Sequence, residues 1–144
     1  MGGDDVDALE AAVADTWAWA RTLSRTAARA LDPRLDPTAY PMVALIGSRG
    51  ALRPSEMSAA LQLDRSTVSR QIDAAARLGL VERVPDPADA RAVIVRFTPE
   101  TRARMDALRA AHKERWRAAL ATWDPRDITE LTRLLGMLSK VELS

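Results

Sequence analysis

A short polar segment near the middle of the chain carries side chains suited to binding nucleic acid. It supplies guanidinium groups and hydroxyls from Arg65, Ser66, Thr67, Ser69 and Arg70, and no acid occurs between positions 65 and 72. Guanidinium groups bind phosphates and read the edge of guanine, and small hydroxyls donate to phosphates at close range. The segment therefore predicts a DNA-contacting surface, although Ser and Arg are also common on ordinary solvated helix faces.

This chemistry requires the polar side chains to share one face of a helix. On a helical wheel, four apolar residues gather on one side, namely Val68, Ile72, Ala75 and Leu78. Polar residues gather near the opposite side, namely Ser66, Arg70, Asp73 and Arg77. Asp64 is a suitable N-cap and Gly79 a suitable stop, so the pattern predicts a helix over 65–78 that packs by one face and presents the other.

The neighbouring segments predict the elements that would hold this helix. Pro54-Ser55-Glu56 opens a short helix through Leu61, and strand-like residues from Leu80 to Phe97 flank a polar tip at 85–89. Two short helices followed by a β-hairpin form a winged helix-turn-helix, whose second helix can enter the DNA major groove. We expect Arg53, Arg83 and Arg96 to add phosphate contacts.

Longer helices are predicted on either side of this lobe. One covers 5–31 and stops at Asp32-Pro33, and another starts near Asp36-Pro37 with an irregular first turn and closes at Gly47 and Gly50. A helix from Thr98-Pro99 carries an apolar stripe, namely Met105, Leu108, His112, Trp116, Ala119 and Trp123. Asp124 caps the last helix, whose stripe comprises Ile128, Leu131, Leu134, Leu135 and Leu138, with Val141 beside it. The predicted fold class is mainly α with a small β-hairpin wing (α+β).

The apolar stripes of the terminal helices are broader than a small winged lobe can cover. Exposed apolar patches of this kind usually mark an interface, so we expect a dimer. The alternative is that the stripes pack only within one chain. The chain is expected to form one folding unit, in which residues 1–35 and 99–144 form a helical dimerisation region and 36–98 form the DNA-binding lobe.

Composition excludes several other classes of function. The 144 residues include no Cys and one His, so thiol catalysis and clustered metal ligands are not expected. No catalytic motif is recognised, and we expect neither an enzyme nor a cofactor or metal. The net charge of +1 hides an acidic start, because residues 1–31 carry −2 whereas residues 49–98 carry +2. Without a signal peptide or a long apolar run, the protein is expected to be cytoplasmic.

Four segments resemble the MarR family of transcriptional regulators. Asp89-Ala90-Arg91 and the following strand to Thr98 resemble the family's wing signature, and Leu78-Gly79-Leu80-Val81-Glu82-Arg83 its entry into the wing. Leu52–Leu61 and Asp64–Arg70 are similar to its paired DNA-binding helices. Three positions depart from the family pattern: Phe97, Thr101, and Arg53, which replaces a Ser or Thr cap and adds a cation.

The resemblance implies a homodimer whose first, fifth and sixth helices interlock. Two recognition helices would then read half-sites of a palindromic operator in double-stranded DNA, roughly 34–36 Å apart. Arg91 would enter the minor groove, with Asp89 orienting it or bracing the wing. The alternative is that Asp89 and Arg91 form a local ion pair that only stabilises the hairpin.

The resemblance also implies a small aromatic or anionic effector bound between the dimer helices and the winged lobe. The residues on the segments that would line such a site are Trp17, Trp19, Arg21, Tyr40, His112 and Trp116, with Arg25 as a second cation. Aromatic residues at helical spacing are also common in cores and interfaces.

The sequence thus predicts a homodimeric, sequence-specific DNA-binding regulator, a repressor released by a small ligand. The expected DNA-binding residues are Arg53, Arg65, Ser66, Thr67, Ser69, Arg70, Arg83, Asp89, Arg91 and Arg96. The alternative is a helical protein-interaction module that keeps the winged-helix fold and does not bind DNA.

Overall fold

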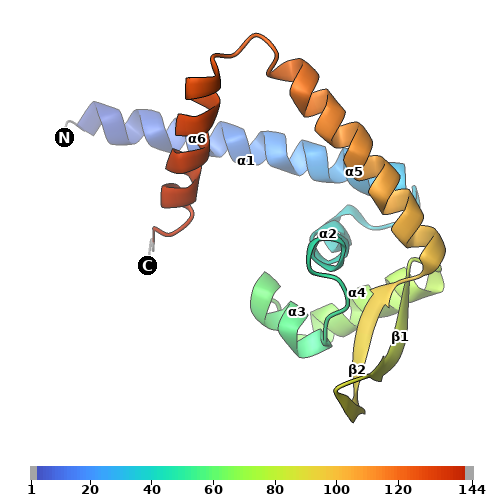
Figure 1. The fold of residues 1–144 in the computed structure, drawn as a ribbon. Helices are drawn as coiled ribbons and strands as arrows, with labels where there is room; N and C mark the ends of the chain where they lie inside the picture. The colour runs from blue at the N-terminus through green and yellow to red at the C-terminus, as the bar shows by residue number, and fades with distance from the viewer. Residues whose placement is uncertain (1–2, 142–144) are drawn as a thin grey trace. The chain divides into compact units, whose positions relative to one another are not determined.

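The computed structural model describes residues 3–141, which form six α-helices, one 3₁₀ turn and a two-stranded hairpin (Figure 1). The elements are α1 (Gly3–Leu31), η1 (Pro37–Ala39), α2 (Tyr40–Arg49), α3 (Pro54–Leu61), α4 (Arg65–Arg77), β1 (Val81–Asp86), β2 (Asp89–Phe97), α5 (Pro99–Ala119) and α6 (Pro125–Leu138). The predicted fold class and element order are confirmed.

The chain forms two compact units, one extending to Leu108 and one starting at Arg109. The first contains α1 to β2 and the beginning of α5, and the second contains the rest of α5 and α6. The helix α5 is continuous through the boundary between them.

Aspartate caps set the starts of three elements, as the sequence predicts. The carboxylate of Asp36 accepts the N–H of Thr38 at 2.9 Å, and that of Asp124 accepts the N–H of Arg126 at 2.8 Å. Asp64 caps α4 in the same way. The first amides of a helix have no partner within the helix, so a carboxylate that accepts from them fixes where the helix begins.

A single apolar core holds the helix-turn-helix and the hairpin together. Its members include Met42, Val43 and Ile46 of α2, Met57 of α3, Val68, Ile72 and Ala75 of α4, and Val95 and Phe97 of β2. The end of α1 enters the same core through Ala28 and Leu31, and α5 enters through Met105. The face of α4 predicted to pack is therefore buried, with Leu78 partly buried beside it.

The hairpin is antiparallel, and its pairing becomes irregular near the tip. Val81 to Pro85 pair in step with Phe97 to Val93, and the register then shifts so that Asp86 pairs with Asp89. The stretch 90–92 of β2 thus has no β1 partner in this register. Leu52, just before α3, forms an antiparallel bridge to Val95, with N···O distances of 3.0 and 2.8 Å.

Three details of the predicted boundaries are wrong. Gly47 does not end its helix, because α2 continues to Arg49 and Gly50 provides the C-cap with a positive φ of 85°. The polar tip is shorter than 85–89, because β1 extends to Asp86 and β2 begins at Asp89. Trp123 is not on the α5 stripe, because α5 ends at Ala119 and Trp123 lies in the turn before α6.

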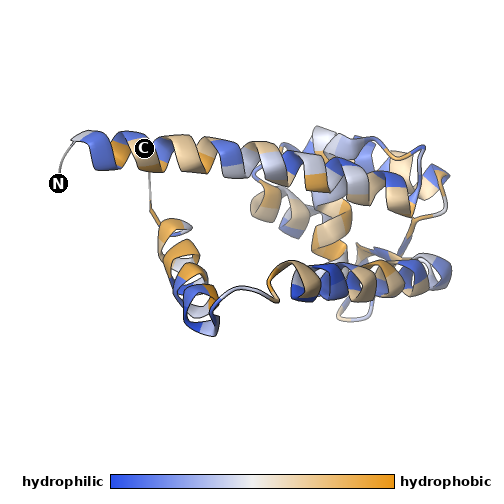
Figure 2. Ribbon diagram, turned by 90° about the horizontal axis from the view of Figure 1, so that it is seen from above, coloured by the Kyte–Doolittle hydropathy of each residue, from blue (hydrophilic) through white to orange (hydrophobic). Residues whose placement is uncertain are grey.

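Large apolar side chains remain exposed on the terminal helices. On α6 these are Leu131, Leu134, Leu135, Met137 and Leu138, and on α1 they include Val6, Leu9, Trp17 and Trp19. Figure 2 shows hydrophobic residues along both helices. Within residues 3–141, no helix is long and apolar enough to cross a membrane.

An almost buried carboxylate closes the end of α1. Asp32, whose side chain is 4% exposed, accepts the backbone N–H of Arg34 at 2.9 Å and its Nε and Nη2 at 3.0 and 2.7 Å. The guanidinium of Arg104, on α5, donates to the carbonyl of Leu31. Hydrogen bonds from the side chain and backbone of Arg34 outweigh burial and lower the pKa of Asp32 to about 2.

Replacing Asp32 by Asn should destabilise the protein by about 2 kcal/mol at neutral pH, because the ionised form carries these bonds. A lowered pKa stabilises the fold at pH values above the unfolded pKa. The contribution is therefore present above about pH 4 and is lost as the pH falls through about 2. Urea unfolding of both proteins from pH 7 to 2 should show the difference shrinking with acid.

Asp106→Asn, which removes an exposed acid from α5, serves as the control and should change stability little. An Asp32→Asn deficit that stays constant down to pH 2 would contradict this account.

Candidate nucleic-acid interface

The first turn of α4 is organised by the carboxylate of Asp64. Its Oδ1 accepts the backbone N–H of Thr67 at 2.7 Å and the hydroxyl of Ser66 at 2.6 Å, and its Oδ2 accepts the hydroxyl of Thr67 at 2.8 Å. These bonds, led by that from Ser66, lower the pKa of Asp64 to about 2. Two of the three predicted phosphate-donating hydroxyls are thus already used within the protein.

The arginines of α4 lie on its outer face. Arg65 and Arg70 are exposed, as is Ser69, whereas Thr67 is half-buried. The Nη2 of Arg70 donates to the Thr67 hydroxyl at 3.1 Å. Among residues 3–141, no acid lies within ion-pairing distance of Arg65 or Arg70. Both guanidinium groups therefore keep donors for an external acceptor.

Arg53 takes part in an ion pair between α3 and the wing. Its Nε and Nη2 lie 2.7 and 2.6 Å from Oδ2 of Asp86, and its backbone N–H donates to the Glu56 carboxylate at 2.6 Å. Arg53 stands at the N-cap of α3 in place of a Ser or Thr, and the Glu56 carboxylate satisfies the backbone N–H of this N-cap residue. The cation that this position adds is balanced by Asp86.

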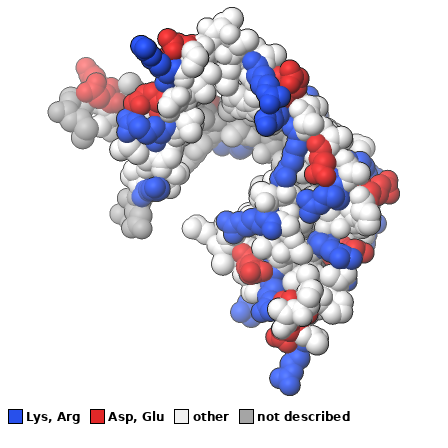
Figure 3. Space-filling view, in the orientation of Figure 1, with Lys and Arg blue, Asp and Glu red and all other residues white. Residues whose placement is uncertain are grey.

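Two further arginines of the wing are also paired. Nη2 of Arg83 lies 2.6 Å from Asp73 of α4, and Nε of Arg96 lies 2.8 Å from Glu82 on the neighbouring strand. Both pairs are partly exposed, so their charges remain accessible to solvent. Figure 3 shows that Lys and Arg are interspersed with Asp and Glu on the visible face of the molecule.

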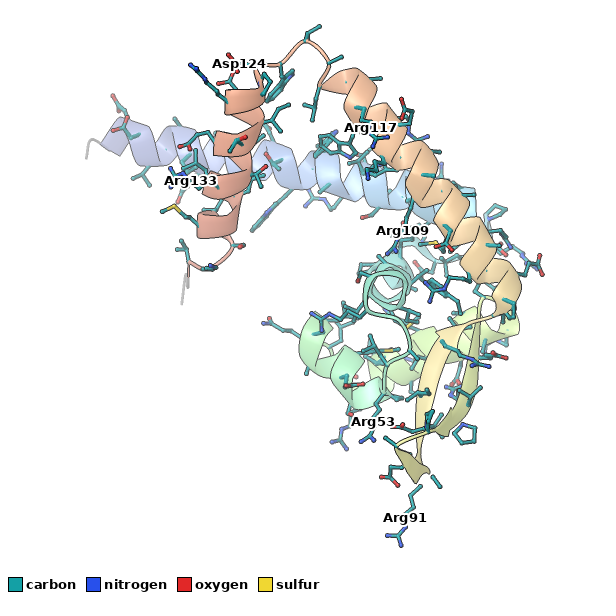
Figure 4. The ribbon with its side chains drawn as sticks, viewed as in Figure 1. Arg53, Arg91, Arg109, Arg117, Asp124 and Arg133 are labelled. Atoms are coloured by element: carbon teal, nitrogen blue, oxygen red, sulfur yellow. The ribbon has the colours of Figure 1, made fainter. Side chains whose placement is uncertain are left out.

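The wing tip carries a cation that points away from the protein. Arg91 is exposed and extends beyond the end of the hairpin (Figure 4). The carboxylate of Asp89 accepts the backbone N–H of Arg91 at 3.0 Å, and no ion pair joins their side chains in the part of the chain described. Asp89 therefore braces the tip through the backbone and leaves the guanidinium of Arg91 outside.

A shallow depression lies between the paired helices and the wing. It is lined by Arg53, Pro54, Ser55, Ser58, Arg65, Ala92 and Val93. The beginnings of α3 and α4 and the outer part of β2 thus share one surface. Of the residues predicted to bind DNA, Arg53 and Arg65 line this depression.

The residues predicted to line an effector site fall into two groups. Trp17, 63% exposed, Trp19 and Arg21 lie on α1, and Tyr40 packs against the core at the start of α2. His112 and Trp116 lie one turn apart on α5, in the other unit. There the indole N–H of Trp116 donates to Nε2 of His112 at 2.7 Å, with the rings edge to face.

Sequence comparison supplies the family. A profile of the MarR family matches residues 35–92. The chain is 30% identical over 130 residues to the HTH-type transcriptional regulator PecS of Dickeya dadantii (strain 3937), covering 83% of this chain and 78% of that protein. The chain belongs to the MarR family. PecS is a transcriptional regulator. This chain is likewise a MarR-family transcriptional regulator with a winged-helix fold.

Other MarR proteins match in part of the sequence or in fold. The multiple antibiotic resistance protein MarR of Salmonella typhimurium is 32% identical over 63 residues, 44% of each chain. The solved structure of a MarR family protein from Bacillus stearothermophilus superposes with a TM-score of 0.79 at 21% identity, covering 97% of this chain and 96% of that one. A second, from Methanosarcina mazei Go1, gives a TM-score of 0.74 at 16% identity. These two structures establish the fold.

Sequence reasoning missed the acids that organise this surface. From the sequence, Asp86 has no predicted role and Glu56 is predicted only as part of a helix start, although both acids bind Arg53. Glu56 follows Arg53 by three residues, which is the spacing of a reciprocal helix cap and could have been recognised. Asp86 is 33 positions from Arg53, and no local spacing rule connects the two.

Replacing Asp64 by Ala should lower the melting temperature by about 3 °C, because the first turn of α4 loses its cap. Thermal unfolding followed by circular dichroism measures this effect. Asp64→Asn is the matched control, since Asn also caps helices and should lower the melting temperature less. Equal losses in the two variants would show that capping is not the main role of Asp64.

Proposed function

We propose that this MarR-family regulator is a homodimer that binds a palindromic operator in double-stranded DNA and represses transcription until a small ligand releases it. The observation that carries the proposal is the outer face of α4. Arg65 and Arg70 are exposed there, and Arg65 shares a depression with Ala92 and Val93 of the hairpin. The tip of that hairpin presents Arg91 (Figure 4). Membership of the MarR family supports the same function.

The proposed roles follow from the accessibility of each side chain. Arg65 and Arg70 read base edges in the major groove, with Ser69 donating to DNA beside them. Ser66 and Thr67 fix the first turn through Asp64 and allow close approach because they are small. Arg91 enters the minor groove, whose negative potential attracts a cation, and Asp89 braces it. The phosphates of the DNA backbone are contacted by three arginines that stay paired with their acids, namely Arg53, Arg83 and Arg96.

Dimerisation is proposed from the exposed apolar side chains of α1 and α6. Leu131, Leu134 and Leu135 on α6 are each more than two-fifths exposed, as is Leu9 on α1. Leaving so many large apolar groups in water is costly, and a second copy of the chain would cover them. A two-fold dimer also presents two equivalent α4 helices to the half-sites of a palindrome.

Release by a ligand is proposed from the family and from the aromatic residues of α1, α2 and α5. A small aromatic or anionic compound would contact Trp17, Trp19, Tyr40, His112 and Trp116, with Arg21 as the cation for an acid group. Aromatic walls with a few polar groups suit such a compound.

Arg70→Ala and Arg91→Ala should weaken DNA binding in different ways. The first removes a base-reading group, so discrimination between operator and mutated operator should fall by about 1–3 kcal/mol. The second removes a cation from the minor groove, so affinity should fall for all sequences and the salt slope should decrease by about 1. Fluorescence anisotropy with DNA from upstream of the chain's own gene, at several salt concentrations, measures both.

Arg109→Ala is the control, since it removes an exposed arginine of α5 that lies outside the proposed DNA surface. If the wild-type protein does not bind this DNA at low salt, the proposal fails in favour of a protein-interaction module.

Sedimentation equilibrium at micromolar concentration should give twice the 15.8 kDa mass of the chain. Leu135→Lys should shift the protein toward monomer, because it places a charge in the proposed interface. Thr132→Lys, also exposed on α6, controls for the added charge. A wild-type protein that sediments as a monomer would contradict the dimer.

A further inference from the structure

An acid is bound to Arg53, one of the arginines proposed to contact DNA. The carboxylate of Asp86, 10% exposed, accepts Nε and Nη2 of Arg53 on one oxygen and the backbone N–H of Ala88, at 2.8 Å, on the other. These bonds lower the pKa of Asp86, that from Ala88 most, so the group is ionised. A negative charge at this place opposes the approach of phosphates, so it needs a compensating role.

The segment before α3 is attached to the wing at two levels. Near its base, the backbone bridge between Leu52 and Val95 joins β2 to the segment before α3. Near its tip, the side chains of Arg53 and Asp86 make the second attachment. Arg53 immediately follows Leu52, so both attachments start from the same short segment of backbone.

The outer attachment lies where the strand pairing becomes irregular. Regular pairing ends at Pro85 and Val93, and Arg91 lies in the stretch that has no β1 partner before Asp86 meets Asp89. The strand ladder therefore does not fix Arg91 directly. Its place depends on the turn held by Asp86 through Ala88 and on the brace from Asp89.

We infer that Asp86 is a positioning residue for DNA binding, which holds Arg53 and the wing turn in the arrangement that directs Arg91 toward DNA. Removing this acid therefore weakens DNA binding, although it also removes a negative charge from the binding surface. The inference rests on the proposed DNA binding and adds a residue that acts through its neighbours and not by touching DNA.

Removing the acid is expected to change the affinity for DNA in two opposite ways, one through charge and one through positioning. If charge alone mattered, loss of an acid beside the phosphates would tighten binding. If positioning dominates, loss of the charge-assisted hydrogen bonds from Arg53 to Asp86 loosens the wing and weakens binding. The direction of the change in affinity decides between them.

The test measures binding of Asp86→Asn and Asp86→Ala to the upstream DNA by fluorescence anisotropy. We expect each to bind about tenfold more weakly than the wild type. Glu82→Gln is the matched control, because it removes one negative charge from the same strand, from the partly exposed pair with Arg96. This control should bind as tightly as the wild type or more tightly.

A double-mutant cycle separates positioning from a general loss of stability. In the Arg91→Ala background, Asp86→Asn should cost less than half of its effect in the wild type, because Asp86 acts partly through Arg91. Equal effects in the two backgrounds would contradict the inference. Hydrogen exchange of the free protein adds a readout without DNA: the amides of Ala88 and Arg91 should exchange faster in Asp86→Asn, and unchanged exchange would also contradict it.

Failure of the inference can be distinguished from failure of the proposed function. A wild-type protein that binds, with Asp86→Asn binding equally or more tightly, would overturn the positioning role alone. A wild-type protein that does not bind would overturn the DNA-binding proposal and this role with it.

Discussion

Burial of one face of α4 is the constraint on which the DNA-facing surface depends. Val68, Ile72 and Ala75 are fully buried against α2, α3 and the hairpin, so the helix cannot rotate without exposing them. Fixing this face fixes the opposite one, where the arginines lie. Asp64 adds the second constraint by setting the residue at which the helix begins. The direction in which the α4 arginines point is thus set by the packing of the buried face of α4.

Half of the six arginines proposed to contact DNA are held in ion pairs within the protein. Arg53, Arg83 and Arg96 are each paired with an acid, whereas Arg65, Arg70 and Arg91 are not within ion-pairing distance of one in the described chain. Pairing limits the non-specific attraction of DNA, which grows with the number of available cations. A chain with a net charge close to zero can therefore still present unpaired arginines at the positions proposed to contact DNA.

The sequence predicted much of the fold because its signals are local. Aspartate and proline at helix starts, and apolar residues at helical spacing, determine the order and most boundaries of the elements. The end predicted at Gly47 is wrong because glycine is tolerated inside a helix, whereas the positive φ of 85° at Gly50 favours glycine and ends α2 there. The Arg53–Asp86 pair could not be predicted, because it depends on the hairpin register and on the shift after Pro85. Likewise, only the structure shows that the Ser66 and Thr67 hydroxyls bind Asp64.

The four tryptophans of the chain have an unusual distribution. Trp17 and Trp19 lie on α1, Trp116 lies on α5 and Trp123 follows it, and all four side chains are more than a third exposed. None lies between η1 and the end of β2, and none is among the residues proposed to touch DNA. The tryptophan fluorescence of this protein therefore originates entirely outside its helix-turn-helix and wing. Indole emission therefore reports on α1, on α5 and on the turn after α5. The proposed DNA-facing lobe contributes no tryptophan emission.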